Sequence, residues 1–111
     1  MNLSMETREN ILVVKLKGEL DHHSAESTRK KIDKAIIEKG SKNIILDLKE
    51  LSFMDSSGIG LIMGRYKNIS QKDGKLFVIS GNQYVDRILK MSGLLKIIEA
   101  YPEMDTALKN I

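Results

Sequence analysis

The chain contains no cysteine, no tryptophan and a single proline, and aromatic residues make up only 5% of it. Without cysteine there is no disulfide framework, no thiolate metal site and no cysteine nucleophile. The longest wholly apolar runs, such as Ile11 to Val14, are far too short to span a membrane, and the N-terminus turns polar too soon for a signal peptide. We therefore expect a cytoplasmic protein with no membrane partner.

What is present fits a small globular protein. The chain has 111 residues, of which 41% are hydrophobic and 30% charged, a size and composition expected for one domain over residues 1–111. Its formal charge is +3, from 18 basic and 15 acidic residues, and the lysines are spread along the chain. Because no basic patch stands out, we expect no direct contact with nucleic acid.

Hydrophobic patterning predicts an alternation of strands and helices. A hairpin of two strands is followed by four helices that alternate with three more strands, which indicates an α/β fold with a mixed, mostly parallel sheet flanked by about four helices. Gly60 and Gly64 are expected to let the second helix approach the sheet closely. The predicted strands cover 3–8, 11–17, 43–48, 75–79 and 94–98, and the predicted helices cover 24–39, about 56–69, 83–91 and 102–109.

The most unusual segment is Phe53-Met54-Asp55-Ser56-Ser57-Gly58-Ile59-Gly60, which follows the predicted strand at 43–48 and begins a helix. Loops beyond the carboxyl ends of parallel strands are the usual binding positions in open α/β sheets. In the simplest interpretation, Asp55 or Ser56 caps the helix and the glycines allow tight backbone geometry.

Two catalytic or nucleotide-binding interpretations of this segment lack their motifs. A serine nucleophile is expected in a Gly-x-Ser-x-Gly elbow, which is absent. A dinucleotide loop requires a third glycine one residue earlier than Gly64, and no Gly-Lys-Ser/Thr follows. We therefore expect neither an enzyme nor a bound cofactor.

Phosphorylation of a serine at this helix start is a third interpretation. A phosphate adds about −1.5 to −2 charges and three strong acceptors, and a helix N-terminus accommodates such an anion well. The fold would survive the modification while the surface around Ser56 changed its charge. A partner bound there would then be expelled.

A second polar segment, Asp21-His22-His23, precedes the first predicted helix. Adjacent histidines without a third ligand at helical spacing favour a loop over a metal site. Asp21 either caps the helix at 24–39 or offers a carboxylate to a basic partner, and the sequence leaves both open. The methionines Met54, Met63 and Met91 are expected to fill gaps in the core.

Three motifs together resemble one family closely. They are Gly18-Glu19-Leu20-Asp21-His22-His23, the segment from Phe53 to Gly60 continued by Gly64-Arg65-Tyr66-Lys67, and Met91-Ser92-Gly93-Leu94-Leu95-Lys96-Ile97-Ile98. Their order and spacing over nearly the whole chain are similar to those of the sporulation-type anti-sigma F factor antagonists, which are single STAS domains. The chain departs from that family at Asp47, where asparagine is common, and at Ser80-Gly81-Asn82-Gln83-Tyr84, which replaces a proline-containing segment.

The resemblance implies a phosphorylation switch without enzymatic activity. The unphosphorylated form would bind an anti-sigma factor that is also a serine kinase, together with its nucleotide, and release the sigma factor. Phosphorylation would end that complex, and a PP2C-type serine phosphatase would reset the cycle. The protein itself would be a monomer; an alternative role is that of a general stress or stressosome-type STAS scaffold.

The same resemblance assigns residues. The phosphorylated residue would be Ser56, the first serine of Asp-Ser-Ser-Gly. The residues implied to bind the partner are Asp21, His22, Asp55, Ser57, Gly58, Ile59 and Ile88, with Asp21 expected to contact an arginine of the kinase.

Overall fold

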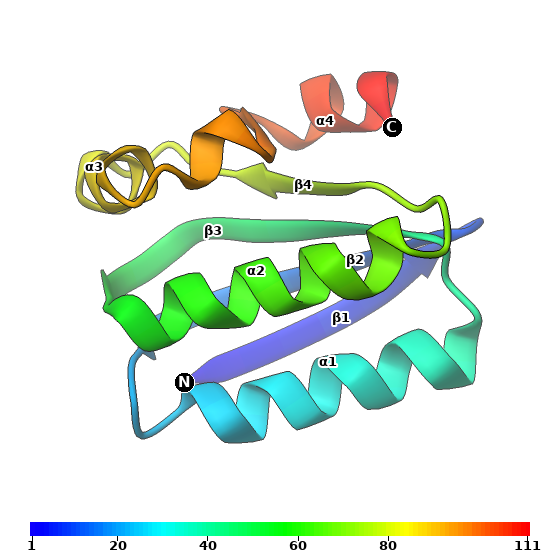
Figure 1. Cartoon of the computed structure of the whole chain (residues 1–111), viewed down its shortest axis with the longest axis horizontal. Coiled ribbons are helices and arrows are strands. Elements are labelled where there is room, and N and C mark those ends of the chain that lie inside the picture. The colour runs from blue at the N-terminus through cyan, green and yellow to red at the C-terminus, as the bar shows by residue number, and fades with distance from the viewer.

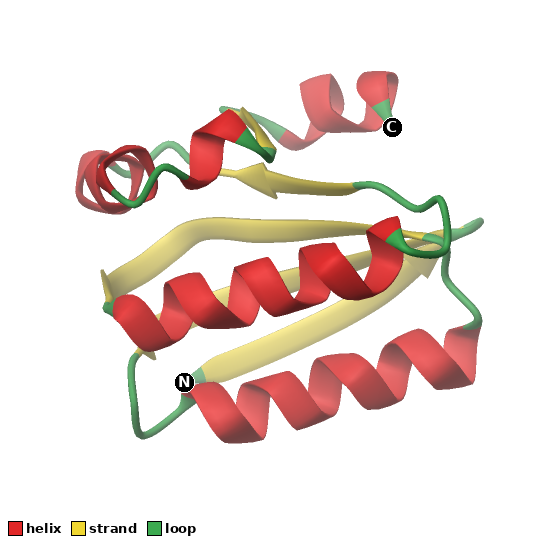
Figure 2. Cartoon of the chain, in the orientation of Figure 1, coloured by secondary structure: helices red, strands yellow, loops and turns green.

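The computed structural model describes all residues, 1–111, and alternates strands with helices along the chain (Figure 1). The predicted α/β class is confirmed, with helices and strands forming separate layers (Figure 2). The strands are β1 (Asn2–Arg8), β2 (Ile11–Leu20), β3 (Asn43–Met54), β4 (Leu76–Ile79) and β5 (Glu99–Tyr101). The helices are α1 (Ala25–Lys39), α2 (Ser56–Ser70), α3 (Gln83–Met91) and α4 (Met104–Asn110), with a short 3₁₀ helix, η1 (Leu94–Lys96), after α3.

All five strands form one sheet in the order β1-β2-β3-β4-β5. β1 and β2 pair antiparallel as the predicted hairpin, with Glu9 in the left-handed region (φ 54°) at its two-residue turn. The other three pairs are parallel, so each requires a crossover, and these crossovers contain α1, α2 and α3. The mixed, mostly parallel sheet is therefore confirmed.

The two faces of the sheet are covered unequally. α1 and α2 lie side by side across one face (Figure 1), where they and α3 bury a hydrophobic cluster of 21 residues. α4 covers part of the other face, where the cluster has only five buried residues. Alternation along β2 supplies both clusters, because Leu12 and Val14 point to the first face and Val13 to the second.

The helices on the larger cluster follow the predicted stripes. α1 buries Thr28, Ile32 and Ile36 on one side and ends at Gly40, whose amide donates to the carbonyl of Ile36 at 3.0 Å. Gly40 has a φ of 61°, the left-handed conformation that favours glycine after a helix. The predicted glycine C-cap is therefore confirmed.

Four predicted boundaries are wrong. The second strand, β2, continues to Leu20 instead of ending at residue 17, because it stays paired with β3 as far as Met54. The central strand continues to Met54 instead of ending at residue 48, because Leu51 and Met54 are buried beyond the exposed pair Lys49 and Glu50. The strand predicted at 94–98 is instead η1, followed by β5 at 99–101. The last helix begins two residues later than predicted, so Pro102 precedes it.

Candidate functional site

The start of α2 is fixed by Asp55, which follows β3 directly. Its backbone is extended (φ −115°, ψ −166°), and Oδ1 of its carboxylate accepts a hydrogen bond of 2.8 Å from the amide of Ser57. Such a cap satisfies one of the four amides that a helix start leaves free. Of the two capping candidates, Asp55 is therefore the cap, and the hydroxyl of Ser56 is free of that role.

Asp55 also joins two segments that are distant in the sequence. Its Oδ2 accepts a hydrogen bond of 3.2 Å from the amide of His22, and its own amide donates to the carbonyl of Leu20 at 3.3 Å. The loop between β2 and α1 is thereby held against the first turn of α2. One carboxylate thus brings together the two polar segments that the sequence singled out.

The loop between β2 and α1 is shaped by Asp21. Its Oδ1 accepts hydrogen bonds from the amides of His23 at 2.9 Å and Ser24 at 3.1 Å. The bond from the Ser24 amide is the main reason that the pKa of Asp21 lies below its usual value. Asp21 holds this turn, whereas the N-cap residue of α1 is Ser24. The side chain of Asp21 is 23% exposed.

The two serines after Asp55 face different surroundings. Ser56 is exposed and lines a groove of about 380 Å³ that we call the apolar groove, whereas Ser57 is half-buried and lines one of about 290 Å³ that we call the arginine groove. The apolar groove is formed by Met54, Asp55, Ser56, Ile59, Ile88, Met91 and Ser92. The arginine groove is formed by His22, Ala25, Glu26, Arg29, Ser57, Gly60, Leu61 and Arg65.

The structure therefore divides the predicted partner residues into groups. Asp55, Ile59 and Ile88 surround Ser56 in the apolar groove, although Ile88 comes from α3 and the others from the start of α2. His22 and Ser57 meet in the arginine groove instead. Asp21 lies in neither groove, but in the adjoining loop.

Gly58 is buried beneath this surface. A Cβ on Gly58 would lie 2.4 Å from Cγ of Met54 and 3.1 Å from Cδ2 of Leu20, so no larger residue fits without displacing the core. The predicted close approach at Gly60 and Gly64 is wrong, because a Cβ on either would meet nothing within 4 Å. The close contact of α2 with the sheet is at Gly58, two residues before Gly60.

The predictions for the three methionines have different outcomes. Met54 is buried, with 1% exposed, and Met63 packs against the large cluster, as expected of core residues. Met91 is 80% exposed, so its prediction as a core residue is wrong. It lies at the end of α3 three residues after Ile88, a spacing that places both side chains on one helix face beside Ser56. This spacing was the signal in the sequence for the groove.

Arg29 and Arg65 are further residues that sequence reasoning missed. They come from α1 and α2, and both contact the carboxylate of Asp33, at 3.2 Å from Nη1 of Arg29 and 2.9 Å from Nε of Arg65. Arg29 also pairs with Glu26 one turn earlier on α1. Nothing in the sequence spacing indicates the contact between the two helices.

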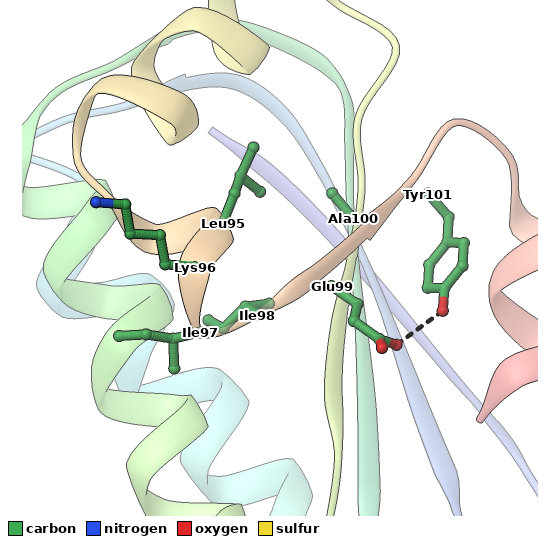
Figure 3. A pocket seen from close by; sticks show the side chains of 7 residues that line it. All are labelled: Leu95, Lys96, Ile97, Ile98, Glu99, Ala100 and Tyr101. Carbon is green, nitrogen blue, oxygen red and sulfur yellow. Dashed lines mark hydrogen bonds between the residues drawn. The ribbon is translucent and has the colours of Figure 1, made fainter.

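Other parts of the molecule offer less chemistry. A hollow of about 610 Å³ lies along η1 and β5, where Figure 3 shows the side chain of Tyr101 directed at Glu99. The hydroxyl of Tyr101 donates a bond of 2.7 Å to that carboxylate, which raises the pKa of Tyr101 above its usual value. No three His, Cys, Asp or Glu side chains are placed to hold a metal ion, and none of the helices is long and apolar enough to cross a bilayer.

The sequence matches the STAS domain over residues 2–107. The chain belongs to the STAS domain family. An anti-sigma F factor antagonist of Paenibacillus polymyxa is 45% identical over 111 residues, which are 100% of this chain and 95% of that protein. Another, of Lysinibacillus sphaericus, is 41% identical over 92 residues, which are 83% of this chain and 78% of the relative.

Solved STAS structures share this fold. The anti-sigma factor antagonist SpoIIAA in its unphosphorylated form has a TM-score of 0.77 and 27% identity, and the alignment covers 98% of this chain and 96% of that chain. The phosphorylated form of Bacillus SpoIIAA has a TM-score of 0.76 and 31% identity, with 99% of this chain and 100% of that chain covered. The predicted STAS fold is therefore confirmed.

The positions at which this STAS domain departs from the expected motif are well ordered by local contacts. Asp47 is buried, and its Oδ1 accepts a hydrogen bond of 3.1 Å from the amide of Lys49. Asn82 caps α3 by accepting from the amide of Tyr84 at 2.9 Å, while its Nδ2 donates to the carbonyl of Leu51 at 2.7 Å. The start of α3 is thus anchored to β3 without a proline.

Proposed function

We propose that this STAS domain is an anti-sigma factor antagonist controlled by phosphorylation of Ser56. Its unphosphorylated form binds an anti-sigma factor that is also a serine kinase, and this binding releases the sigma factor. The observation that carries the proposal is the exposure of Ser56 at the capped start of α2, at the edge of the apolar groove. The relatives that are named anti-sigma F factor antagonists support it.

The groove explains why phosphate at Ser56 would end binding. Ile59, Ile88 and Met91 present apolar surface, which is stabilised by contact with an apolar partner surface. A phosphate of about −2 charge at the edge of that contact would have to lose its hydration when the partner bound. The start of α2 nevertheless tolerates the charge, because helix N-termini favour anions. The switch thus acts on the surface and leaves the core unchanged.

The partner surface in this proposal extends beyond the groove. Asp21 offers its carboxylate to an arginine of the kinase, while His22 and Ser57 contribute from the arginine groove. Gly58 acts from below by letting α2 approach β3, and Asp55 by fixing the turn that presents Ser56. Met91 joins Ile59 and Ile88 as a contact residue that the resemblance did not assign.

The remaining features of the proposal are those that the resemblance to anti-sigma F factor antagonists implies and those expected from the sequence. The nucleotide belongs to the kinase, and a PP2C-type serine phosphatase removes the phosphate. This chain acts in the cytoplasm as a monomer, through binding rather than catalysis, with no cofactor and no direct contact with nucleic acid.

The decisive experiment mixes the protein with an anti-sigma kinase and ATP, locates phosphate by peptide mass spectrometry, and measures binding of both forms. We expect phosphate on Ser56, and binding that is lost with it. Ser56→Ala should bind but accept no phosphate, and Ser70→Ala, at an exposed serine of α2 outside both grooves, is the control that should still be phosphorylated. Normal phosphorylation of Ser56→Ala would overturn the proposal. Stable large assemblies in sizing chromatography would instead favour the stressosome-type scaffold.

A further inference from the structure

The arginine groove lies between α1 and α2 and shares no lining residue with the apolar groove. Its lining brings two guanidinium groups, Arg29 and Arg65, to one hollow with the side chain of His22 and the hydroxyl of Ser57. Its one carboxylate is that of Glu26, which is 63% exposed and already paired with Arg29. The groove is therefore rich in hydrogen-bond donors.

Arg65 is unusual because it is buried without enough acceptors. The residue is 8% exposed, and its Nη1 is buried and donates to no acceptor in the protein. Its Nε lies 2.9 Å from Oδ1 of Asp33, but the N–H is not aligned on that oxygen, so neither atom has a hydrogen bond. A guanidinium carries five donors, and a buried donor without an acceptor is costly.

Arg65 and Arg29 share one carboxylate. Asp33 is the one ion-pair partner of Arg65, whereas Arg29 also pairs with Glu26, so two carboxylates face the two arginines. Burial lowers the pKa of Arg65, Asp33 opposes this effect, and the neighbouring charge of Arg29 adds to it. Arg65, not Arg29, is therefore the cation that has buried donors left for a further acceptor.

We propose that the arginine groove is an oxyanion site for a phosphate group, held by Arg65, Arg29 and the hydroxyl of Ser57. Donors reach the hollow from α1 and from the first three turns of α2, which suits a tetrahedral anion with acceptors on several sides better than a flat carboxylate. The partial positive charge at the N-terminus of α2 also favours an anion at this site. This site is separate from the transfer of phosphate to Ser56 and goes beyond the proposed function.

The source of the phosphate is either free inorganic phosphate or a phosphate monoester. The groove volume of about 290 Å³ is several times that of a water molecule's share of liquid, about 30 Å³, and leaves room for a substituent beside the anion. Inorganic phosphate and methyl phosphate are therefore the two probes. Tighter binding of the ester would identify a monoester as the ligand, and tighter binding of inorganic phosphate would identify the free anion; both results support the site.

The test is a titration of the full chain with each probe at constant ionic strength, followed by ¹H–¹⁵N spectra that include the arginine side chains. We expect saturable shifts at Arg29, Arg65 and the amides of residues 57–60. Arg29→Gln and Ser57→Ala should each weaken binding on the order of fivefold or more, because each removes a donor to the anion. Lys34→Gln is the matched control, since it removes one charge from α1 outside the groove.

The outcomes separate this site from the proposed function and from unspecific screening. Ser56→Ala should bind phosphate normally, even though it accepts none from a kinase. Arg65 is buried, so Arg65→Gln also changes the packing between α1 and α2, and Arg29→Gln and Ser57→Ala decide the question if that variant does not fold. Shifts that do not saturate, or that weaken equally in Lys34→Gln and Arg29→Gln, would overturn the site.

Discussion

Asp55 stabilises both the start of α2 and the loop before α1, so its removal should affect both. Asp55→Ala would leave the amides of Ser57 and His22 without their acceptors at 2.8 Å and 3.2 Å. A helix cap contributes about 1 kcal/mol and a further hydrogen bond about 1 kcal/mol, so we expect the free energy of unfolding to fall by about 2 kcal/mol. Urea denaturation followed by circular dichroism measures this change.

Asp55→Asn is the matched variant. Asparagine keeps the capping oxygen for Ser57 but presents an amide group where His22 now donates to a carboxylate oxygen. The loss of stability should be about half that of the alanine variant. Equal stability of wild type and Asp55→Ala would contradict a role for Asp55 in joining these elements.

Asp21 makes the free energy of unfolding depend on pH below about pH 4. The backbone hydrogen bond from Ser24 lowers the pKa of Asp21 from 3.8, so the folded state favours the charged carboxylate more than the unfolded state does. Its contribution is fully present above the unfolded value of about 4 and is lost as the pH falls through the lower folded value. Asp21→Asn should therefore show a weaker loss of stability than wild type below about pH 4.

The direct measurement is an NMR titration of the Asp21 carboxyl carbon in the folded protein. A midpoint below 3.8 is expected from the hydrogen bonds that His23 and Ser24 donate. A midpoint at or above that value would show that the turn does not hold the charged form.

The candidate site could be predicted only in part, and individual residues show why. Asp55 and Ser56 follow from local chemistry, since a capping residue between a strand and a helix is visible in the sequence. The joining of Asp55 to His22 spans 33 residues and depends on how β2 lies beside β3. Met91 and Arg65 illustrate the same limit. From residue type alone, methionine is expected in the core and arginine on the surface, but tertiary packing exposes Met91 and buries Arg65.

At the level of elements, regular periodicity predicted the helices well and short apolar runs poorly. α3 was predicted at its observed bounds, because its apolar residues follow a helical period and Asn82 caps its start. The run from Leu94 to Ile98 has the length of a strand, but the amides of Ile97 and Ile98 both donate to the carbonyl of Leu94 and close a turn. Gly93 adopts the left-handed conformation (φ 80°), which changes the direction of the chain after α3 and favours that turn.

The packing of α2 on β3 can be tested at Gly58. Gly58→Ala would place a Cβ 2.4 Å from the buried side chain of Met54, so the core must shift. Overpacking of this kind costs about 1–3 kcal/mol, and better helix propensity offsets up to about 1 kcal/mol of it. We expect a net loss of about 1–2 kcal/mol in the free energy of unfolding, measured by urea denaturation.

Gly64→Ala supplies the control on the same helix. A Cβ there meets nothing within 4 Å, so only the gain in helix propensity remains. That variant should be as stable as wild type or more stable by up to about 1 kcal/mol. If Gly58→Ala were stabilised equally, the close approach of α2 to Met54 would not matter for stability.

For the molecule as a whole, the unequal cover of the sheet determines which face is vulnerable. Three helices share the large cluster, whereas α4 alone covers the second face with its one fully buried residue, Ala107. Val13, Ile45 and Phe77 are buried on that face, with at most 5% exposed. The second face therefore depends on a helix of seven residues, which is too short to be stable without that packing.

Ala107→Asp tests this dependence, because it places a carboxylate against the buried side chains of the second face. An unpaired charge or its neutralised form in such a contact costs about 3 kcal/mol or more, so the midpoint of urea denaturation should fall strongly, and binding of the dye ANS should rise. Thr106→Asp introduces the same side chain at the adjacent exposed position of α4 and should change stability by no more than about 0.5 kcal/mol. Similar midpoints for the two variants would mean that α4 is not needed to cover this face, and that the molecule is held together by the larger cluster alone.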